Sequence, residues 1–387
     1  MEKQKICIIG GGLTGLVTAI SLSKLNCHID LLAGNINQSL KSNRTVAISQ
    51  NNYEFLNKQN IFKTKRKELW PCSKMKLYTQ NENKKISKIF EINKENKTKK
   101  VLYLLENSKI IKLMLNKMKN IKSITIKKNA IVSEILDSGL LKSVKFKNKK
   151  IKYNLVIVCA GSNSNLVKNI FKKNFIKYSY EEMSITTIVS HKLCKNNTAR
   201  QIFLNDEILA LLPISNTKTS IVWSVKKKLY KKNDLLLKKK LNFYLKNYLK
   251  KIKFQTKVQY QDLNFSVPNK YFKNRILLFG DALHAIHPLA GQGFNMTLRD
   301  LSSLEKTLSN KINLGLDIGS LDILSEFSDE NKSKNFIFST GINLVKDSFS
   351  FQNKSFKNLR DIILKNLNKS NVAKDVFLNL ADNGLKF

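Results

Sequence analysis

A glycine-rich turn close to the start of the chain limits the folds that the sequence can adopt. Residues 5–9 form a short apolar run, and the sequence GGGLTG follows before an apolar stretch with helical character. Gly10, Gly12 and Gly15 have the GxGxxG spacing that permits a tight turn, close approach of a pyrophosphate and close packing of the helix. Free N–H groups and the dipole at the start of such a helix favour an anion. The pattern therefore predicts a Rossmann-like strand, turn and helix, with a second strand at residues 28–32.

The predicted second strand lacks the acidic residue that usually follows such a turn. In Rossmann folds, an aspartate or glutamate about twenty residues after the glycines binds the ribose hydroxyls. By register this position is Ala33, and Asp30 falls earlier, inside the strand. We therefore expect the ribose contact to be missing or to come from elsewhere in the chain.

A second glycine-containing stretch, RILLFGDALHAIHPLAGQGFNMTLRD, occupies residues 275–300. The apolar residues 276–279 predict a buried strand, Gly280 and Asp281 predict a turn, and residues 295–304 predict a helix. The loop between them has the sequence HPLAGQG. Glycines at the joint between a strand and a helix let bare backbone approach a cofactor. The stretch therefore predicts a second part of the same cofactor site.

The remaining sequence separates into an alternating α/β part and a strand-rich part. Residues 108–118 have apolar side chains at helical spacing, and the fully apolar residues 155–158 predict a buried strand that ends in a turn. In doubly wound sheets, that end of the strands is where ligands bind. From 178 to 267, short strands predict an antiparallel sheet with an amphipathic helix at 234–251. We expect an α/β fold in which a Rossmann-like domain is interleaved with an antiparallel-sheet domain and is followed by C-terminal helices.

These changes of pattern set the expected domain boundaries. The cofactor-binding domain is expected at residues 1–75, 101–175 and 268–320, the substrate-binding sheet domain at 76–100 and 176–267, and a helical region at 321–387. Within the last region, amphipathic stretches near 321–334, 335–346 and 356–367 predict three helices.

Charge is a poor guide to the function of this chain. The formal net charge is +41, which would suit a nucleic-acid partner, but only six of the 69 basic residues are arginine and the lysines are spread along the whole length. Phosphate clamping and base recognition favour arginine clusters, so we expect no nucleic-acid partner and at most weak attraction to anionic lipid headgroups. The chain has no apolar run of transmembrane length and no signal peptide, which predicts a cytoplasmic protein.

Cysteine and histidine positions argue against a metal site. The five cysteines are scattered with no CxxC pair, so neither a disulfide framework nor a thiolate metal site is expected. His284 and His287 are spaced i, i+3, but no further histidine or cysteine lies nearby in the sequence to complete a site. We therefore expect no bound metal.

Taken together, these motifs resemble the flavoprotein aromatic hydroxylases of ubiquinone biosynthesis, within the wider para-hydroxybenzoate hydroxylase-like monooxygenases. GGGLTG resembles the ADP-binding turn of this family, and GDALHAIHPLAGQGFNMTLRD resembles its second flavin motif, GDAAHxxHPxAGQGxNxGxxD. SNRTVAIS is similar to the segment whose arginine approaches the flavin, and ALLPISNTKTSIVWSV to the strand pair on the substrate side. The resemblance spans essentially the whole chain.

The resemblance implies FAD as the cofactor and roles for residues of this chain. Gly10, Gly12 and Gly15 would face the FAD pyrophosphate with Arg44 beside them, and Asp281 would hydrogen-bond the ribityl chain. The loop from Pro288 to Asn295 would line the isoalloxazine ring, where its N–H groups stabilise the negative charge of the reduced ring. The implied cofactor-binding residues are Gly10, Gly12, Leu13, Thr14, Gly15, Arg44, Val132, Gly280, Asp281, Pro288, Gly291, Gln292, Gly293, Phe294 and Asn295.

Two positions depart from the family pattern. The ribose-binding acid is Ala33, and the family's DGxxS motif is replaced by AGSNS, with Ala160 at the position of the aspartate. In relatives this aspartate helps to shape the cofactor cleft. The substitutions imply weaker FAD binding, altered use of the reductant, or a divergent subgroup that tolerates both changes.

The resemblance also implies the chemistry. NAD(P)H would reduce the flavin, O2 would add at C4a to give a hydroperoxide, and the ring of a polyprenyl phenol would attack the distal oxygen. The catalytic residues stay unknown; His191 and Tyr180 are two candidates for the base that activates the phenol. The substrate class implies peripheral contact with the inner face of the cytoplasmic membrane and association with other quinone-biosynthesis proteins.

Two alternatives remain open at this point. The first keeps FAD but changes the reaction to that of a dehydrogenase, reductase or halogenase, because one fold hosts many chemistries. The second is a non-catalytic scaffold in a lipid-biosynthesis complex, which the alanines at positions 33 and 160 suggest.

Overall fold

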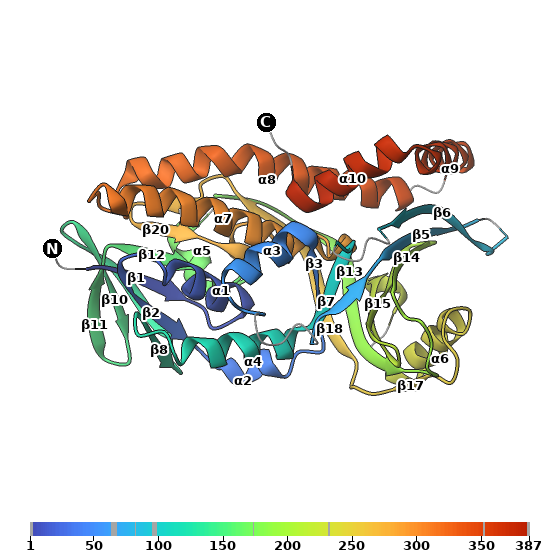
Figure 1. Ribbon diagram of the computed structural model, residues 1–387, viewed down its shortest axis with the longest axis horizontal. Coiled ribbons are helices and arrows are strands. Elements are labelled where there is room, and N and C mark those ends of the chain that lie inside the picture. The colour runs from blue at the N-terminus through green and yellow to red at the C-terminus, as the bar shows by residue number, and fades with distance from the viewer. Residues whose placement is uncertain are drawn as a thin grey trace.

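A six-stranded, mostly parallel sheet forms one end of the molecule (Figure 1). The computed structural model describes residues 3–62, 68–81, 83–94, 99–172, 174–230, 233–350 and 353–384. The order of the strands is β19-β20-β12-β1-β2-β8, and all neighbours are parallel except β19 and β20. The strands are β1 (Gln4–Ile9), β2 (Cys27–Ala33), β8 (Ile124–Lys128), β12 (Leu155–Val158), β19 (Phe272–Lys273) and β20 (Ile276–Leu278).

Helices cover this sheet because its central strands are apolar on both faces. All four residues of β12 are buried, as are the last four of β1, which is the pattern of a parallel sheet that has both faces covered. Helix α1 packs against both α4 and α7. The helices of this part of the chain are α1 (Leu13–Leu22), α2 (Ile36–Leu40), α3 (Gln50–Lys58), α4 (Asn107–Met118), α5 (Asn165–Phe171) and α7 (Gln292–Asn313).

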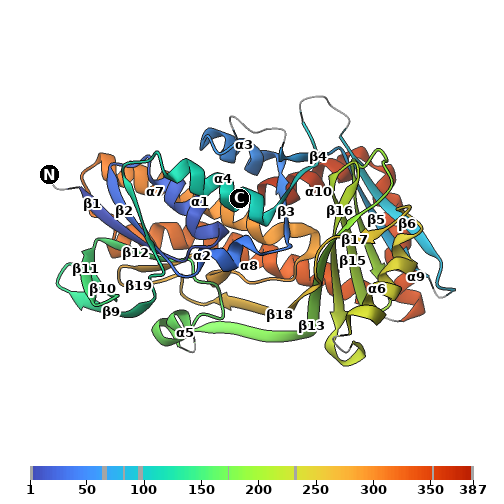
Figure 2. The ribbon, with the colours of Figure 1, turned by 90° about the horizontal axis from the view of Figure 1, so that it is seen from below.

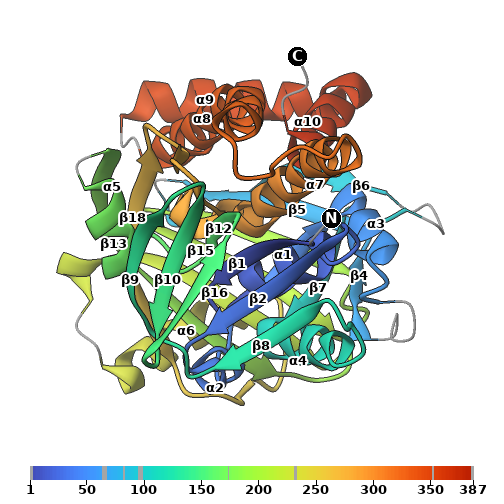
Figure 3. The ribbon, with the colours of Figure 1, turned by 90° about the vertical axis from the view of Figure 1, so that its left-hand side faces the viewer.

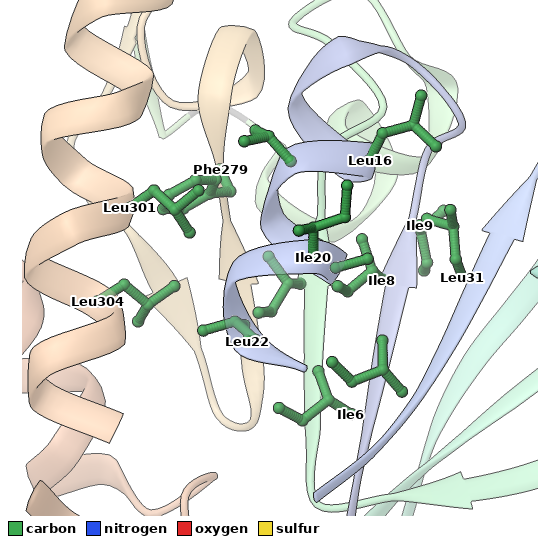
Figure 4. Packing of buried hydrophobic residues seen from close by; sticks show 14 of the residues in the cluster. Ile6, Ile8, Ile9, Leu16, Ile20, Leu22, Leu31, Phe279, Leu301 and Leu304 are labelled. Carbon is green, nitrogen blue, oxygen red and sulfur yellow. The ribbon is translucent and has the colours of Figure 1, made fainter. Parts of the chain in front are cut away.

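The main hydrophobic core lies between the parallel sheet, α1 and α7. Figure 4 shows Ile8 of β1 and Ile20 of α1 on one side and Leu301 and Leu304 of α7 on the other, with Phe279 beside Leu301. All five side chains are almost completely inaccessible to solvent. The first strand and helix are therefore packed directly against the helix that follows the second glycine-containing stretch, about 280 residues later in the chain.

A second, largely antiparallel sheet of eight strands forms the other end of the molecule. Its order is β17-β13-β16-β15-β14-β5-β6, with β18 paired to β13, and the single parallel pair is β14 with β5. Helix α6 (Asp234–Leu245) packs on it around the buried Trp223. The strands are β5 (Lys74–Gln80), β6 (Ile86–Asn93), β13 (Phe175–Ser190), β14 (Thr198–Leu204), β15 (Glu207–Ser215), β16 (Lys218–Lys226), β17 (Lys253–Phe254) and β18 (Gln259–Pro268).

The long strands β13 and β18 connect the two ends of the molecule, as Figure 2 shows. Two three-stranded sheets complete the strand structure, in the orders β3-β7-β4 and β11-β10-β9. Their strands are β3 (Thr45–Ser49), β4 (Trp70–Cys72), β7 (Leu102–Glu106), β9 (Val132–Ser138), β10 (Leu141–Phe146) and β11 (Lys149–Tyr153).

Three C-terminal helices form a layer along one side of the molecule (Figure 3). They are α8 (Leu321–Ser350), α9 (Lys354–Lys369) and α10 (Asn371–Asn383). Helix α8 packs against α7, and α9 packs against β6 of the second sheet. This layer therefore contacts both halves of the fold.

The structure confirms the expected fold class and corrects several helix boundaries. The stretches predicted at 321–334 and 335–346 are one continuous helix, α8, because no proline or glycine separates them. The helix predicted at 295–304 runs from Gln292 to Asn313, since the left-handed Gly291 precedes it and no breaker follows until Gly315. The helix predicted at 234–251 ends at Leu245. Sequence patterning had not predicted α2, α3, α10 or β7.

A buried hydrogen bond in the parallel sheet yields a test of this fold. The Tyr153 hydroxyl donates to Oδ2 of the buried Asp30 at 2.8 Å. Tyr153→Phe leaves this carboxylate without that donor, and we expect a loss of about 1.5–3 kcal/mol in the free energy of unfolding, measured by urea denaturation. In the Asp30→Asn background the same substitution should have a much smaller effect. Equal effects in both backgrounds would contradict the assignment.

Candidate functional site

The turn between β1 and α1 is shaped by backbone contacts that leave no room for side chains. Gly10 has a φ of +131°, and a Cβ there would lie 2.6 Å from the carbonyl oxygen of Cys159. A Cβ on Gly15 would overlap the carbonyl oxygen of Gly10. At Gly12, which precedes α1, a Cβ would meet nothing within 4 Å and no side chain caps the helix. The first N–H groups of α1 therefore face open space that an anionic group can occupy.

The end of β20 meets this turn directly. Gly280 has a φ of +65°, and a Cβ there would lie 2.5 Å from the Thr14 Cγ2 atom. The next residue, Asp281, is exposed, and Leu13 packs partly buried against the core beneath the turn. The two glycine-containing stretches of the sequence thus form one continuous surface.

The loop before α7, from Pro288 to Gly291, packs against β3. A Cβ on Gly291, which has a φ of +68°, would lie 2.8 Å from the Ala47 Cβ atom. The Asn295 amide nitrogen donates to the Ala47 carbonyl at 2.9 Å, and its Oδ1 accepts from the N–H of Ser49 at 3.1 Å and from Asn52 at 3.1 Å. Asn295 is completely buried. Its side chain therefore holds the loop in place, rather than facing the cleft.

The rest of this loop is partly open. Gln292 is buried at the start of α7, whereas Pro288, Gly293 and Phe294 are half-buried. A Cβ on Gly293 would meet nothing within 4 Å. No side chain caps α7 and its first turn contains no acidic residue. The N-terminus of this 22-residue helix thus presents free N–H groups and a favourable dipole to a negative charge.

Arg44 and Asp281 supply opposite charges to the site. Arg44 precedes β3 and is exposed, but the chain around its guanidinium group displaces water and lowers its pKa, an effect that Asp281 opposes. Burial raises the pKa of the Cys159 thiol to about 12, a hydrogen bond with Thr18 opposes the shift, and Asp281 adds to it. Cys159 is therefore a neutral thiol, and Arg44 is a cation close enough to Asp281 for their charges to interact.

The structure shows what lies at the end of β2, where the sequence lacks the usual acid. Ala33 is fully buried, and a Cβ on Gly11 would lie 2.7 Å from the Ala33 Cβ. Asp30 faces Tyr153 inside the sheet and does not reach the turn. The N–H of Ala130 donates to the Ala33 carbonyl at the end of β2. Val132, two residues later, is half-buried and begins β9. Val132 therefore lies near the end of β2, on the side of the turn away from the Pro288 loop.

His284 and His287 face different carboxylates. His284 lies 2.7 Å from Oδ2 of Asp300, whose other oxygen accepts from Asn335 of α8. His287 lies 3.0 Å from Oε2 of Glu182 on β13. No group of three or more histidine, cysteine, aspartate or glutamate side chains within the described ranges has the geometry of a metal site.

The two candidate bases lie far apart along β13, with Tyr180 inside the strand and His191 just after its last residue. The Tyr180 hydroxyl accepts from the backbone N–H of His287 at 3.2 Å, which places it at the loop. His191 lies eleven positions after Tyr180, where it hydrogen-bonds Thr219 at 3.0 Å. Sequence reasoning missed Glu182, which hydrogen-bonds His287, and Lys346, which pairs with Glu182, because nothing in their local sequence distinguishes them from surface charges.

A wide groove of about 960 Å³ lies elsewhere, between α6 and the β5–β6 hairpin, lined by Tyr78, Phe243, Tyr244 and Tyr248 among others. None of its lining residues belongs to the glycine turns or to the Pro288 loop. It is therefore separate from the candidate site.

The joined glycine turns define a dinucleotide-binding class of protein. Residues 3–317 match the model of a family described as FAD binding domain, and the chain belongs to this family. FAD is therefore the cofactor, and the open N-termini of α1 and α7 fit its charged groups.

Three known proteins show how the chain relates to others. It is 23% identical over 395 residues to ubiquinone biosynthesis monooxygenase COQ6, mitochondrial, of Caenorhabditis elegans, covering 87% of this chain and 86% of that protein. It is 22% identical over 267 residues to ubiquinone hydroxylase UbiM of Neisseria meningitidis, covering 68% and 58%. The crystal structure of p-nitrophenol 4-monooxygenase PnpA from Pseudomonas putida DLL-E4 superposes with a TM-score of 0.81 at 16% identity over the full length of both chains, which shows the shared fold.

Gly291 offers a test of the loop geometry. Gly291→Ala places a methyl group against Ala47 and adds the left-handed backbone cost of about 1–2 kcal/mol. We expect the purified variant to contain much less FAD per chain, measured by absorbance after unfolding. Ala47→Gly should restore part of the FAD content, because it removes the steric overlap but not the backbone cost. Gly341→Ala, in open space on α8, is the matched control; unchanged FAD in Gly291→Ala would refute the geometry.

Proposed function

We propose that the protein is an FAD-dependent monooxygenase that hydroxylates the aromatic ring of a polyprenyl phenol in ubiquinone biosynthesis, using NAD(P)H and O2. The observation that carries the proposal is the single surface formed by the β1–α1 turn, Gly280–Asp281 and the Pro288 loop. The names of the COQ6 and UbiM relatives support the substrate class. In this proposal residues 1–75, 101–175 and 268–320 hold FAD, and residues 76–100 and 176–267 hold the substrate.

Each part of the surface has a chemical role toward FAD. The N–H groups at the start of α1 bind the pyrophosphate, and Arg44 adds positive charge there. Asp281 accepts hydrogen bonds from the ribityl hydroxyls. The uncapped N-terminus of α7 stabilises negative charge on the reduced ring. FAD supplies the oxygen chemistry, and the chain supplies binding, orientation and exclusion of water.

The two departures from the family pattern are compatible with this role. Ala33 is fully buried at the end of β2, directly beside Gly11 of the turn. Ala160 is exposed beside Gly161, which has a φ of +80°. We propose that the chain binds FAD without the ribose-binding acid and relies on the contacts of the Pro288 loop.

Oxygen labelling tests the reaction. With NADH or NADPH, a short-chain prenyl phenol and labelled O2, we expect one labelled oxygen atom in the product, detected by mass spectrometry. Asp281→Ala should lower FAD affinity at least tenfold, since a hydrogen-bonded charged group contributes about 1.5–3 kcal/mol. A yellow protein whose product carries no label would favour another FAD-dependent oxidoreductase. A colourless protein that cannot be reconstituted with FAD would favour the non-catalytic scaffold.

We also propose that the protein docks on an anionic membrane surface through α9 and α10. More than half of the exposed large apolar side chains among the described residues lie on α8, α9 and α10. On α9, Phe356, Leu359, Ile363 and Leu367 follow at helical spacing and form one exposed stripe. Lysines accompany the stripe in a chain of net charge +41, which fits anionic headgroups. No helix of the described chain is long and apolar enough to cross a membrane.

Vesicle sedimentation tests this surface. Leu359→Asp and Ile363→Asp should each weaken binding to vesicles of phosphatidylglycerol and phosphatidylcholine about tenfold, because each buries roughly 1.5–3 kcal/mol of apolar side chain. Leu235→Asp, at a leucine on α6 that is more exposed than either, is the control and should bind like the unaltered protein. Binding should fall as salt rises. Concentration-dependent dimerisation without lipid, abolished by the α9 variants, would assign the stripe to a second copy instead.

A further inference from the structure

A buried cluster of charged and polar side chains lies directly behind the Pro288 loop. Glu182 of β13 accepts from His287 Nε2 at 3.0 Å through one oxygen and from Lys346 Nζ of α8 at 2.9 Å through the other. All three residues are at most 7% exposed. Burying two charges is costly unless they are paired. The pairing of Glu182 with Lys346 therefore allows both charges to be buried here.

A distortion of β13 brings the strand to this cluster. β13 pairs regularly with β18 up to Ser179 and resumes at Glu182, so that Tyr180 and Glu181 are extra residues in the strand. Glu181 has a φ of +53°, an uncommon conformation for a residue with a side chain. Such bulges redirect side chains and are frequent beside active sites.

The pairing determines which nitrogen of His287 carries the proton. An ionised carboxylate only accepts hydrogen bonds, so the nitrogen facing Glu182 must be protonated. Burial would raise the pKa of Glu182, but His287 and Lys346 outweigh it and hold the pKa below the usual range. Burial lowers the pKa of His287, with Glu182 and Asp347 opposing and Lys346 adding to the shift. His287 is therefore neutral, with its proton on Nε2.

The other nitrogen of His287 is left as an unused acceptor. Among the described residues, Nδ1 of His287 has no hydrogen-bond partner, although the side chain is almost completely buried. A buried acceptor without a donor is rare in folded proteins and points to a missing partner. The Tyr180 hydroxyl does not fill this place, because it accepts from the His287 backbone N–H and donates to Asn343 at 2.5 Å.

An apolar cluster that includes three phenylalanines lies beside the loop. Leu289, two residues after His287, packs with Phe203 of β14 and Ile342 of α8, and Phe338 and Phe349 adjoin this apolar cluster. A phenol held against such a cluster would present an apolar ring and one polar group. His287 is the neutral base nearest in sequence to the loop that approaches FAD.

We propose that Glu182 and Lys346 position His287 so that its Nδ1 atom accepts the proton of the substrate hydroxyl. The inference rests on the proposed function, whose substrate is a phenol. The O–H bond breaks, the proton moves to Nδ1, and the resulting phenolate keeps the electron pair, which makes the ring more electron-rich for oxygen transfer. Glu182 offsets the charge of the imidazolium that forms, and Lys346 holds Glu182 in place through its other oxygen, in the manner of a base oriented by a carboxylate.

Binding of a coloured phenol tests the proposal without requiring turnover. The probe is 4-nitrophenol carrying one prenyl group, added to the oxidised FAD-containing protein, with its phenolate absorbance followed against pH. We expect the unaltered protein to lower the apparent pKa of the bound probe by about one unit or more. His287→Gln keeps a donor toward Glu182 but removes the base, and should abolish the shift.

Glu182→Gln gives a sharper test because of Lys346. Lys346 will donate to the oxygen of the new glutamine amide, so the amide nitrogen faces His287. That nitrogen can only donate, which places the ring proton of His287 on Nδ1. We expect the shift to be lost. Adding Lys346→Met frees the amide to rotate, and should restore part of the shift. A purely structural role predicts the opposite, since a second buried substitution would add to the damage.

Lys332→Met, at an exposed lysine of the same helix, is the control for α8 and should leave the shift unchanged. The inference is overturned if His287→Gln binds the probe as phenolate like the unaltered protein, if the unaltered protein does not favour phenolate, or if the double variant is worse than Glu182→Gln. Should His287→Gln fail to fold, the Glu182→Gln pair decides. If the protein favours the phenolate but its product carries no label from O2, this inference stands and the proposed hydroxylation is rejected. If the product carries label but the protein does not favour the phenolate, the hydroxylation stands and this inference is rejected.

Discussion

The structure depends on the close approach of two backbone turns that lie about 270 residues apart in the chain. Gly280 sits against the Thr14 side chain, and Gly10 sits against the carbonyl of Cys159, at separations that exclude a Cβ atom. These contacts join β1, β12 and β20 at their carboxyl ends, where a parallel sheet presents its ligand-binding edge. The buried side chains of α1 and α7 pack beneath this edge (Figure 4), so the core and the cofactor surface require the same chain geometry.

The C-terminal layer is tied into this site by polar contacts rather than by apolar packing alone. Asn335 of α8 donates to Asp300, which holds His284, and Lys346 of the same helix pairs with Glu182, which holds His287. Both histidines come from the one stretch that carries the flavin motif. Helix α8, which α9 and α10 follow with their exposed apolar side chains, therefore also supplies polar groups behind the Pro288 loop.

The sequence predicted the parts of the site that need a special backbone. Gly10, Gly280 and Gly291 have positive φ values, and a side chain on any of them or on Gly15 would overlap a neighbouring group, so these four positions require glycine. The helix α7 was predicted too short, because its first residues are loop-like in composition and only Gly291 in a left-handed conformation shows where it begins. The role of Asn295 could not be read from its motif, since its partners Ala47, Ser49 and Asn52 lie far away in sequence.

The sequence by itself determined the fold class through local glycine patterns and apolar periodicity, and the resemblance of its two motifs to a known family implied the family and the FAD cofactor. Only the tertiary structure decided which charged side chains meet behind the loop. Glu182 and Lys346 are separated by 164 positions and lie in segments rich in ordinary surface charges, so no local pattern singles them out. A bulge in β13 and the path of α8 bring them to His287, and such long-range pairing is encoded in the packing of the whole chain rather than in any one segment of it.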